Sequence, residues 1–134
     1  RVELALETYG TNLGMAFQLV DDALDYAADQ ARLGKTVGDD FREGKITLPV
    51  LAAYAAGSEE DRAFWQRVIE QSEQQPEDLD HALSLIEKTG AIRITLDRAM
   101  DYARKASEAL SIFPPSRLRQ LLQDTASYTV NRLR

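Results

Sequence analysis

The sequence of 134 residues predicts an all-α protein. Apolar residues recur at spacings of three and four along most of the chain, which is the period of one helix face. Most of the seven glycines and four prolines stand at the ends of these periodic segments, and no segment alternates as a strand would. With 44% hydrophobic residues the chain can bury a modest core. We therefore expect a helical array in which residues 1–134 form a single all-α segment.

The first helix is predicted over residues 2–28 and contains Gly10 and Gly14. A glycine costs a helix interior about 1 kcal/mol relative to alanine, so we expect close packing or a ligand at these two positions. A local break at residues 10–12 is the alternative, and it would divide the segment into two helices. Residues 30–46 follow without a clear period and are predicted as a loop.

Turn and capping residues predict where the next helices begin and end. Residues 49–56 are predicted to form a short helix that begins at a proline and is followed by a glycine. Ser58 and Asp61 have the spacing of a capping box, which opens the following helix. Trp65 lies on the apolar face of that helix, where core packing is favoured over ligand binding. Another helix begins at Pro76 and is followed by a glycine.

Two amphipathic helices complete the predicted array. The helix over residues 91–112 carries an apolar series at i, i+4 and i+7, formed by Ile92, Leu96, Ala99, Ala103, Ala106 and Leu110. Two consecutive prolines end this helix. The last helix is predicted to place on its inner side Leu118, Leu121, Leu122, Thr125, Thr129 and Leu133.

The first helix also carries an acidic face. An advance of about 100° per residue places four aspartates within roughly 50–60° of Gln18, namely Asp21, Asp22, Asp25 and Asp29. Apolar residues occupy nearly all of the remaining circumference, and a helix with this pattern is expected to be buried. We therefore expect the carboxylates to face an internal cleft.

Buried carboxylates need compensation, because an isolated charge in a low-dielectric interior is very costly. Three of these aspartates, Asp21, Asp22 and Asp25, offer hard oxygen ligands and leave coordination positions open, which suits Mg²⁺ shared with substrate phosphate oxygens. Zinc is disfavoured, since the chain has no cysteine and one histidine. The alternative is a solvated acidic face in a chain with 22 acidic residues, but the apolar flanks favour the metal site.

Two runs of sequence resemble a known family. The run GTNLGMAFQLVDDALDY at residues 10–26, followed by LGKTVGDDFREGKITLP at residues 33–49, resembles the second aspartate-rich region of the trans-type polyprenyl diphosphate synthases. TGAIRITLDRAMDYARKA at residues 89–106 is similar to a late helix of that family. The family carries a first aspartate-rich motif on a facing helix, and this sequence has no such motif. The resemblance therefore implies the C-terminal part of a larger prenyltransferase of the octaprenyl or decaprenyl diphosphate synthase type.

The resemblance implies chain elongation, in which isopentenyl diphosphate condenses with an allylic diphosphate after Mg²⁺-assisted ionisation. Magnesium is expected on the three aspartates of the motif. The family pattern assigns phosphate contact to Lys35 and Lys45, and a lysine suits phosphate as a point charge. Gln18 is expected to hydrogen-bond the substrate or to orient a carboxylate. For Asp39 and Asp40, capping or pairing with nearby cations is the alternative to a role in the site.

Two other functions stay open from the sequence: a related terpenoid-fold cyclase, and a helical domain that serves only interaction. The Gly-Lys-Ile-Thr-Leu-Pro run at residues 44–49 disfavours the cyclase. Residues 1–134 alone are expected to have no turnover, because half of the metal-binding cleft is missing. The resemblance also implies a homodimer.

Composition excludes other classes. A net charge of −6 argues against nucleic-acid binding, and the arginines near the end of the chain lack interleaved aromatics. No apolar run has the roughly 18–20 residues of a membrane span. The absence of cysteine is compatible with a reducing compartment, and the expected location is cytoplasmic.

Overall fold

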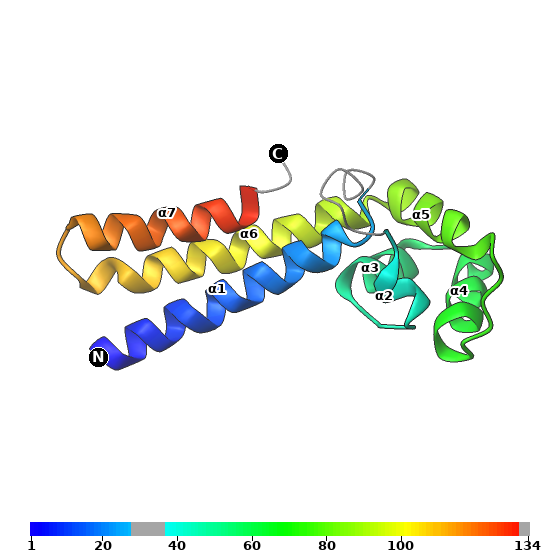
Figure 1. The fold of residues 1–134 in the computed structure, drawn as a ribbon, viewed down its shortest axis with the longest axis horizontal. Helices are drawn as coiled ribbons and strands as arrows, with labels where there is room; N and C mark the ends of the chain where they lie inside the picture. Colours follow the sequence, from blue (N-terminus) through cyan, green and yellow to red (C-terminus); the bar gives the residue numbers. More distant parts are fainter. Residues whose placement is uncertain (28–36, 132–134) are drawn as a thin grey trace. The chain divides into compact units, whose positions relative to one another are not determined.

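The computed structural model describes residues 1–27 and 37–131, and within these ranges every regular element is a helix (Figure 1). The all-α prediction is confirmed. The elements in chain order are α1 (Val2–Leu24), α2 (Asp39–Arg42), α3 (Leu48–Ala56), α4 (Glu59–Trp65), the π-helical turn η2 (Gln66–Glu70), α5 (Asp78–Thr89), α6 (Ala91–Ala109), the 3₁₀ turn η3 (Leu110–Ile112) and α7 (Arg117–Asn131).

Helix α1 runs without a break through both of its glycines, so the alternative of two helices is wrong. A Cβ atom added at Gly10 or Gly14 would meet nothing within 4 Å, and the expected close packing is therefore not found in the described chain. The expectation of burial around the whole helix is also wrong, since Phe17 is 52% exposed and Met15 is 42% exposed.

The chain falls into two compact units. Unit 1 comprises Arg1–Val20 and Leu96–Arg134, and unit 2 comprises Asp21–Thr95. Helices α1 and α6 contribute residues to both units. Within the described residues, no helix is both long enough and apolar enough to cross a membrane.

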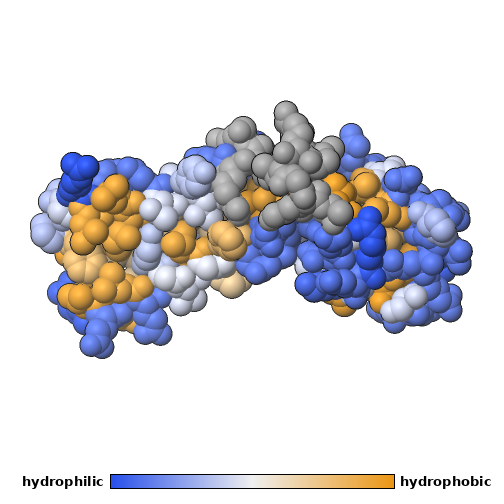
Figure 2. Space-filling view, in the orientation of Figure 1, coloured by the Kyte–Doolittle hydropathy of each residue, from blue (hydrophilic) through white to orange (hydrophobic). Residues whose placement is uncertain are grey.

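The core of unit 1 consists mostly of small side chains. The buried residues of its main cluster are Tyr9, Ala16, Ala103, Ala106, Leu110 and Ala126. The Tyr9 hydroxyl donates a hydrogen bond of 2.9 Å to the backbone oxygen of Leu122 on α7. The predicted inner face of α7 is partly wrong, because Leu118 and Leu121 are exposed and Ala126 is buried. Figure 2 shows apolar surface at the end of unit 1 that holds the α6–α7 connection.

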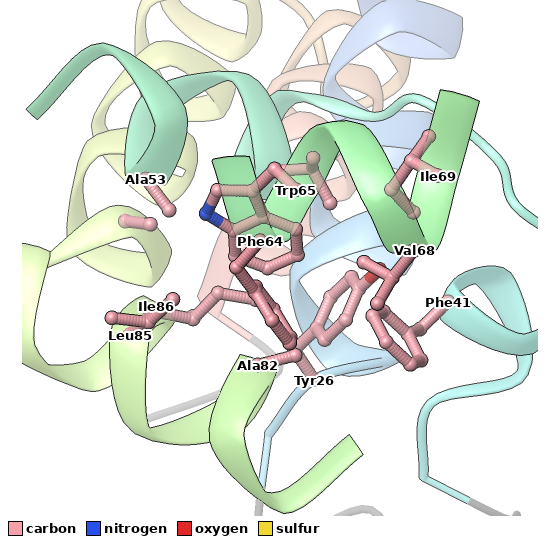
Figure 3. Packing of buried hydrophobic residues seen from close by; sticks show 12 residues of the cluster. Tyr26, Phe41, Ala53, Phe64, Trp65, Val68, Ile69, Ala82, Leu85 and Ile86 are labelled. Atoms are coloured by element: carbon pink, nitrogen blue, oxygen red, sulfur yellow. The ribbon is translucent and has the colours of Figure 1, made fainter. Parts of the chain in front are cut away.

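The core of unit 2 is built from aromatic and branched side chains (Figure 3). The Trp65 ring packs edge to face against Phe64, with ring centroids 5.2 Å apart, and against Phe41 at 6.3 Å. Trp65 is 2% exposed, so its predicted place in the core is confirmed. Val68 and Ile86 are also buried in this cluster.

Local signals in unit 2 were predictable, and the structure bears them out. Ser58 and Asp61 form the capping box at the start of α4, with both reciprocal hydrogen bonds present. Gly90 ends α5 in the left-handed conformation at φ 68°. One contact in unit 2 was not predicted from the sequence. Arg67 makes two hydrogen bonds to the Asp78 carboxylate, at 2.9 and 3.0 Å, which connect η2 to the start of α5.

Candidate functional site

The predicted acidic residues lie at the C-terminal end of α1, which ends at Leu24 and not at the expected residue 28: Asp21 and Asp22 are in its last turn, and Asp25 is the first residue after it. The side chains of Asp22 and Asp25 are buried, at 8% and 7% exposed, and Asp21 is partly buried. The burial expected from the sequence is therefore present at two of the three aspartates. Gln18, one turn earlier on α1, belongs to unit 1 and is exposed.

The short helix α2 lies against this end of α1 through two hydrogen bonds. The backbone N–H of Gly38 donates to the backbone oxygen of Asp25 at 2.8 Å. The backbone N–H of Asp40 donates to Asp25 Oδ2 at 2.9 Å. Residues 30–46 were predicted as a loop, so α2 was not expected. The one available signal was the acidic pair at residues 39 and 40, since carboxylates are favourable in the first turn of a helix.

Gly38 fixes the geometry at the start of α2. Its φ is 83°, in the left-handed region that favours glycine. A Cβ atom at this position would lie 2.5 Å from Leu79 Cδ1, far below ordinary contact distance. Position 38 therefore favours glycine chiefly for its backbone conformation, and a side chain there would also require Leu79 to shift.

Lys45 lies shortly after the end of α2. Its backbone N–H donates to the backbone oxygen of Asp40 at 2.9 Å. Its Nζ atom is 3.2 Å from Glu43 Oε2 and 3.6 Å from Asp40 Oδ1. The hydrogen bond to Glu43 raises the pKa of Lys45, and the charges of Glu43 and Asp40 add to this effect. Asp40 therefore pairs with a nearby cation, Lys45, as the alternative to a role in the site predicted.

The other predicted pairing is present as well. Asp39 Oδ1 lies 2.9 Å from Arg42 Nη1, one helical turn along α2. Lys35, the second predicted phosphate contact, and Asp29, the last residue of the predicted acidic face, lie outside the described residues.

Negative charge accumulates at this end of α1. Burial raises the pKa of Asp25, and the charges of Asp40 and Asp39 raise it further, while the hydrogen bond from the Asp40 amide acts in the opposite direction. Burial also raises the pKa of Tyr26 strongly, with further contributions from the charges of Asp25, Asp40 and Asp22. The charges of Asp25, Asp40 and Asp22 therefore all act on Tyr26, and a bound cation would offset negative charge of this kind.

The fit to a metal is incomplete within the described part of the chain. Residues 1–27 and 37–131 contain no group of three or more histidine, cysteine, aspartate or glutamate side chains positioned to hold an ion. The donors that are present are carboxylate oxygens, which suit a hard divalent cation such as Mg²⁺ or Ca²⁺. One oxygen of Asp25 already accepts the Asp40 amide. The site therefore offers donors of the right chemistry but not a closed cage.

Comparison with known proteins gives the family. The sequence model described as Polyprenyl synthetase matches residues 1–86. The chain belongs to the polyprenyl synthetase family. The resemblance found in the aspartate-rich run is thereby confirmed.

The curated relatives of this polyprenyl synthetase chain include the octaprenyl diphosphate synthases of Haemophilus influenzae and Escherichia coli K12. Each is 42% identical over 130 residues, which is 97% of this chain. The match covers 39% of the first relative and 40% of the second. The chain thus spans well under half the length of these relatives.

Solved structures of the family give the same result for the fold. The polyprenyl synthase of Caulobacter crescentus is 50% identical, with a TM-score of 0.87 over 96% of this chain and 39% of that one. A decaprenyl diphosphate synthase of Rhodobacter capsulatus is 49% identical, with a TM-score of 0.89 over 98% of this chain and 40% of that one. The Caulobacter protein was crystallised in complex with calcium and isoprenyl diphosphate.

Proposed function

We propose that the protein acts in chain elongation by condensing isopentenyl diphosphate with an allylic diphosphate. Membership of the polyprenyl synthetase family and the 42% identity to octaprenyl diphosphate synthases support this activity. The observation that carries the proposal is the burial of Asp22 and Asp25 at the end of α1, in a chain whose structural relative binds calcium and isoprenyl diphosphate. Buried carboxylates of this kind call for a cation.

The metal that we propose is Mg²⁺, and Asp21, Asp22 and Asp25 are the residues that would hold it. When bound, it would neutralise the charge that develops on diphosphate as the allylic carbon–oxygen bond breaks. The three carboxylates would supply hard oxygen ligands and leave positions for phosphate oxygens. Asp25 would do so while one of its oxygens accepts the Asp40 amide at 2.9 Å.

Cationic and polar groups of the chain complete the proposed site. Lys45, with an Nζ atom already held among carboxylates, would contact the diphosphate as a point charge, and Lys35 is proposed for the same role. Gln18 would hydrogen-bond the substrate or orient a carboxylate. As the leaving group departs, the double bond of isopentenyl diphosphate would attack the allylic carbon, and a proton would then be lost to regenerate an alkene.

Calorimetric titration tests the proposed metal site. Mg²⁺ and inorganic pyrophosphate are titrated into the purified protein and into the double variant Asp21→Ala, Asp22→Ala. The proposal predicts Mg²⁺-dependent pyrophosphate binding that the double variant weakens by about tenfold or more, since two ligands to the cation are lost. Glu108→Ala removes an exposed carboxylate from α6 and serves as the matched control, with binding as in the wild type.

Elongation is measured with labelled isopentenyl diphosphate and a short allylic diphosphate, both for residues 1–134 alone, where we expect no turnover, and for a longer protein that also carries the first aspartate-rich motif. A linear prenyl diphosphate product supports the proposal, whereas a cyclic hydrocarbon would indicate the cyclase alternative. Pyrophosphate binding that is absent in the wild type would remove the enzyme proposal and favour a helical interaction domain. The homodimer implied by the resemblance and the cytoplasmic location expected from the composition stay predictions; sedimentation tests the first and cell fractionation the second.

A further inference from the structure

We infer that Asp25 is a positioning residue: it caps the N-terminus of α2 and thereby holds the segment of residues 38–45, with Lys45 at its end, against the end of α1. This role is additional to any contact with a metal. Its link to phosphate binding rests on the proposed function, while the cap itself rests on contacts within unit 2 alone.

The first step is that α2 has no cap of its own. The amides of a first helical turn lack intrahelical acceptors, and a side chain at the N-cap position ordinarily supplies one. Here the N-cap residue is Gly38, which has no side chain and makes no cap hydrogen bond. A residue with a capping side chain would be strained there, because φ is 83°, and its Cβ would require the Leu79 side chain to move.

The second step is that Asp25, in the turn that follows α1, supplies the missing acceptor. Its Oδ2 atom accepts the Asp40 amide at 2.9 Å, and its backbone oxygen accepts the Gly38 amide at 2.8 Å. Asp25 is 7% exposed, so water competes little for these bonds. A carboxylate that accepts backbone amides in a buried position makes strong, charge-assisted hydrogen bonds.

The third step connects the cap to Lys45. The Gly38 backbone oxygen accepts the Arg42 amide at 3.0 Å, which closes the turn of α2. The Asp40 backbone oxygen then accepts the Lys45 amide at 2.9 Å, and the Asp40 carboxylate lies 3.6 Å from Lys45 Nζ. Asp40 is therefore held by Asp25 at its amide and holds Lys45 at two atoms. Lys45 also pairs with Glu43 at 3.2 Å, so loss of the cap would leave its local contacts in place and would free the segment that carries it from the turn after α1.

Substitution of Asp25 by asparagine or by alanine distinguishes the capping role from a role in which the carboxylate charge of Asp25 binds a metal. Asparagine offers an amide oxygen to a backbone N–H and is among the best capping residues, but it carries no charge. Alanine removes both the acceptor and the charge. Positioning by a cap predicts that Asp25→Asn behaves better than Asp25→Ala, whereas a purely ionic role predicts that the two variants are equally impaired.

Amide hydrogen exchange measures the cap directly and needs no ligand. In the wild type, the Asp40 amide should exchange at least tenfold more slowly than an unstructured amide, because it is hydrogen-bonded and shielded. Asp25→Ala should speed its exchange by about fivefold to tenfold, and Asp25→Asn should restore most of the protection. Asp61→Ala removes the separate capping box of α4 and should leave exchange at Asp40 unchanged.

An Asp40 amide that exchanges at the unprotected rate in the wild type would overturn the inference, and this measurement does not depend on the folding of any variant. Equal exchange at Asp40 in the wild type and Asp25→Ala would overturn it as well.

Pyrophosphate binding with Mg²⁺ then tests the connection to Lys45. Asp25→Asn should bind at least about fivefold more tightly than Asp25→Ala, since the cap is restored without the charge. Equally weak binding by both variants, with the Asp40 amide still protected in Asp25→Asn, would overturn the positioning role. A wild type that binds no pyrophosphate would instead refute the proposed function, while the exchange rates would still decide whether Asp25 caps α2.

Discussion

The two units of the chain build their cores from side chains of different size. Unit 1 buries mostly alanines, together with Tyr9 and Leu110. Unit 2 buries the rings of Tyr26, Phe41 and other aromatic residues together with branched aliphatic side chains. Small side chains let helices approach closely and leave no room for added atoms, whereas large rings provide most of the apolar area that a core removes from water. We therefore expect the added side-chain atoms of a larger residue to destabilise unit 1, and the removal of side-chain atoms to destabilise unit 2.

The largest expected effect is the removal of a ring from unit 2. Phe41 is 1% exposed and packs against Trp65, so Phe41→Ala should lower the free energy of unfolding by about 3–5 kcal/mol. Urea denaturation measures the change. Ile46→Ala, at a position that is 61% exposed, is the control and should cost far less. A loss below about 1 kcal/mol at Phe41 would contradict the comparison.

Addition of volume to unit 1 should come next. Ala106 is fully buried, and Ala106→Leu forces extra methyl groups into a core of small residues. We expect a loss of about 1–3 kcal/mol in the free energy of unfolding by the same assay. Arg98→Leu places a leucine on the exposed side of α6 and should be close to neutral. A neutral Ala106→Leu would show that the core of unit 1 has spare room.

Two buried tyrosines, Tyr9 in unit 1 and Tyr26 in unit 2, differ in whether the hydroxyl has a hydrogen-bond partner. Tyr9→Phe removes the hydroxyl that donates to Leu122, so it should cost about 1 kcal/mol of unfolding free energy. The Tyr26 hydroxyl is buried without a hydrogen-bond partner in the described chain, so Tyr26→Phe should be neutral or slightly stabilising. Thermal unfolding of the two variants side by side would contradict this prediction if their order were reversed.

The smallest expected effect is a pH dependence confined to unit 2. The pKa of Asp25 is raised above 3.8, so its contribution to stability is present below pH 3.8 and is lost as the pH rises through the raised value. The pKa of Asp78 is lowered from 3.8, chiefly by the hydrogen bond from Arg67, so its contribution is present above pH 3.8 and is lost as the pH falls.

Unfolding measured across this range without divalent ions should therefore show opposite slopes on the two sides of pH 3.8. Asp25→Asn should remove the pH dependence of stability above pH 3.8 and leave the pH dependence below it unchanged. A slope above pH 3.8 that persists in Asp25→Asn would assign the effect to another group.

Features encoded by neighbouring residues were predictable from the sequence. The capping box of Ser58 with Asp61 and the glycine end of α5 need only a few consecutive residues, and both were correct. The family resemblance was also correct, because it rests on runs of sequence. Periodicity, by contrast, tells which face of a helix is apolar and not what covers it, and for that reason Phe17 and Leu118 were wrongly expected to be buried.

In the candidate site, too, the local features were predictable and the contacts between distant residues were not. The acidic spacing on α1 predicted the burial of Asp22 and Asp25. The short helix α2 and its hydrogen bond to Asp25 were missed, because a four-residue helix has no period to detect and its acceptor lies 15 positions away in the sequence. Contacts of this kind depend on tertiary structure and follow from no local pattern.

The left-handed glycine at position 38 has a consequence for engineering. Because Gly38 can bring no acceptor of its own, the segment it opens is not a transferable module: moved to another scaffold without an aspartate at the equivalent place, it would arrive with its first turn unsatisfied. Any graft of this segment should therefore include the last turns of α1 as well.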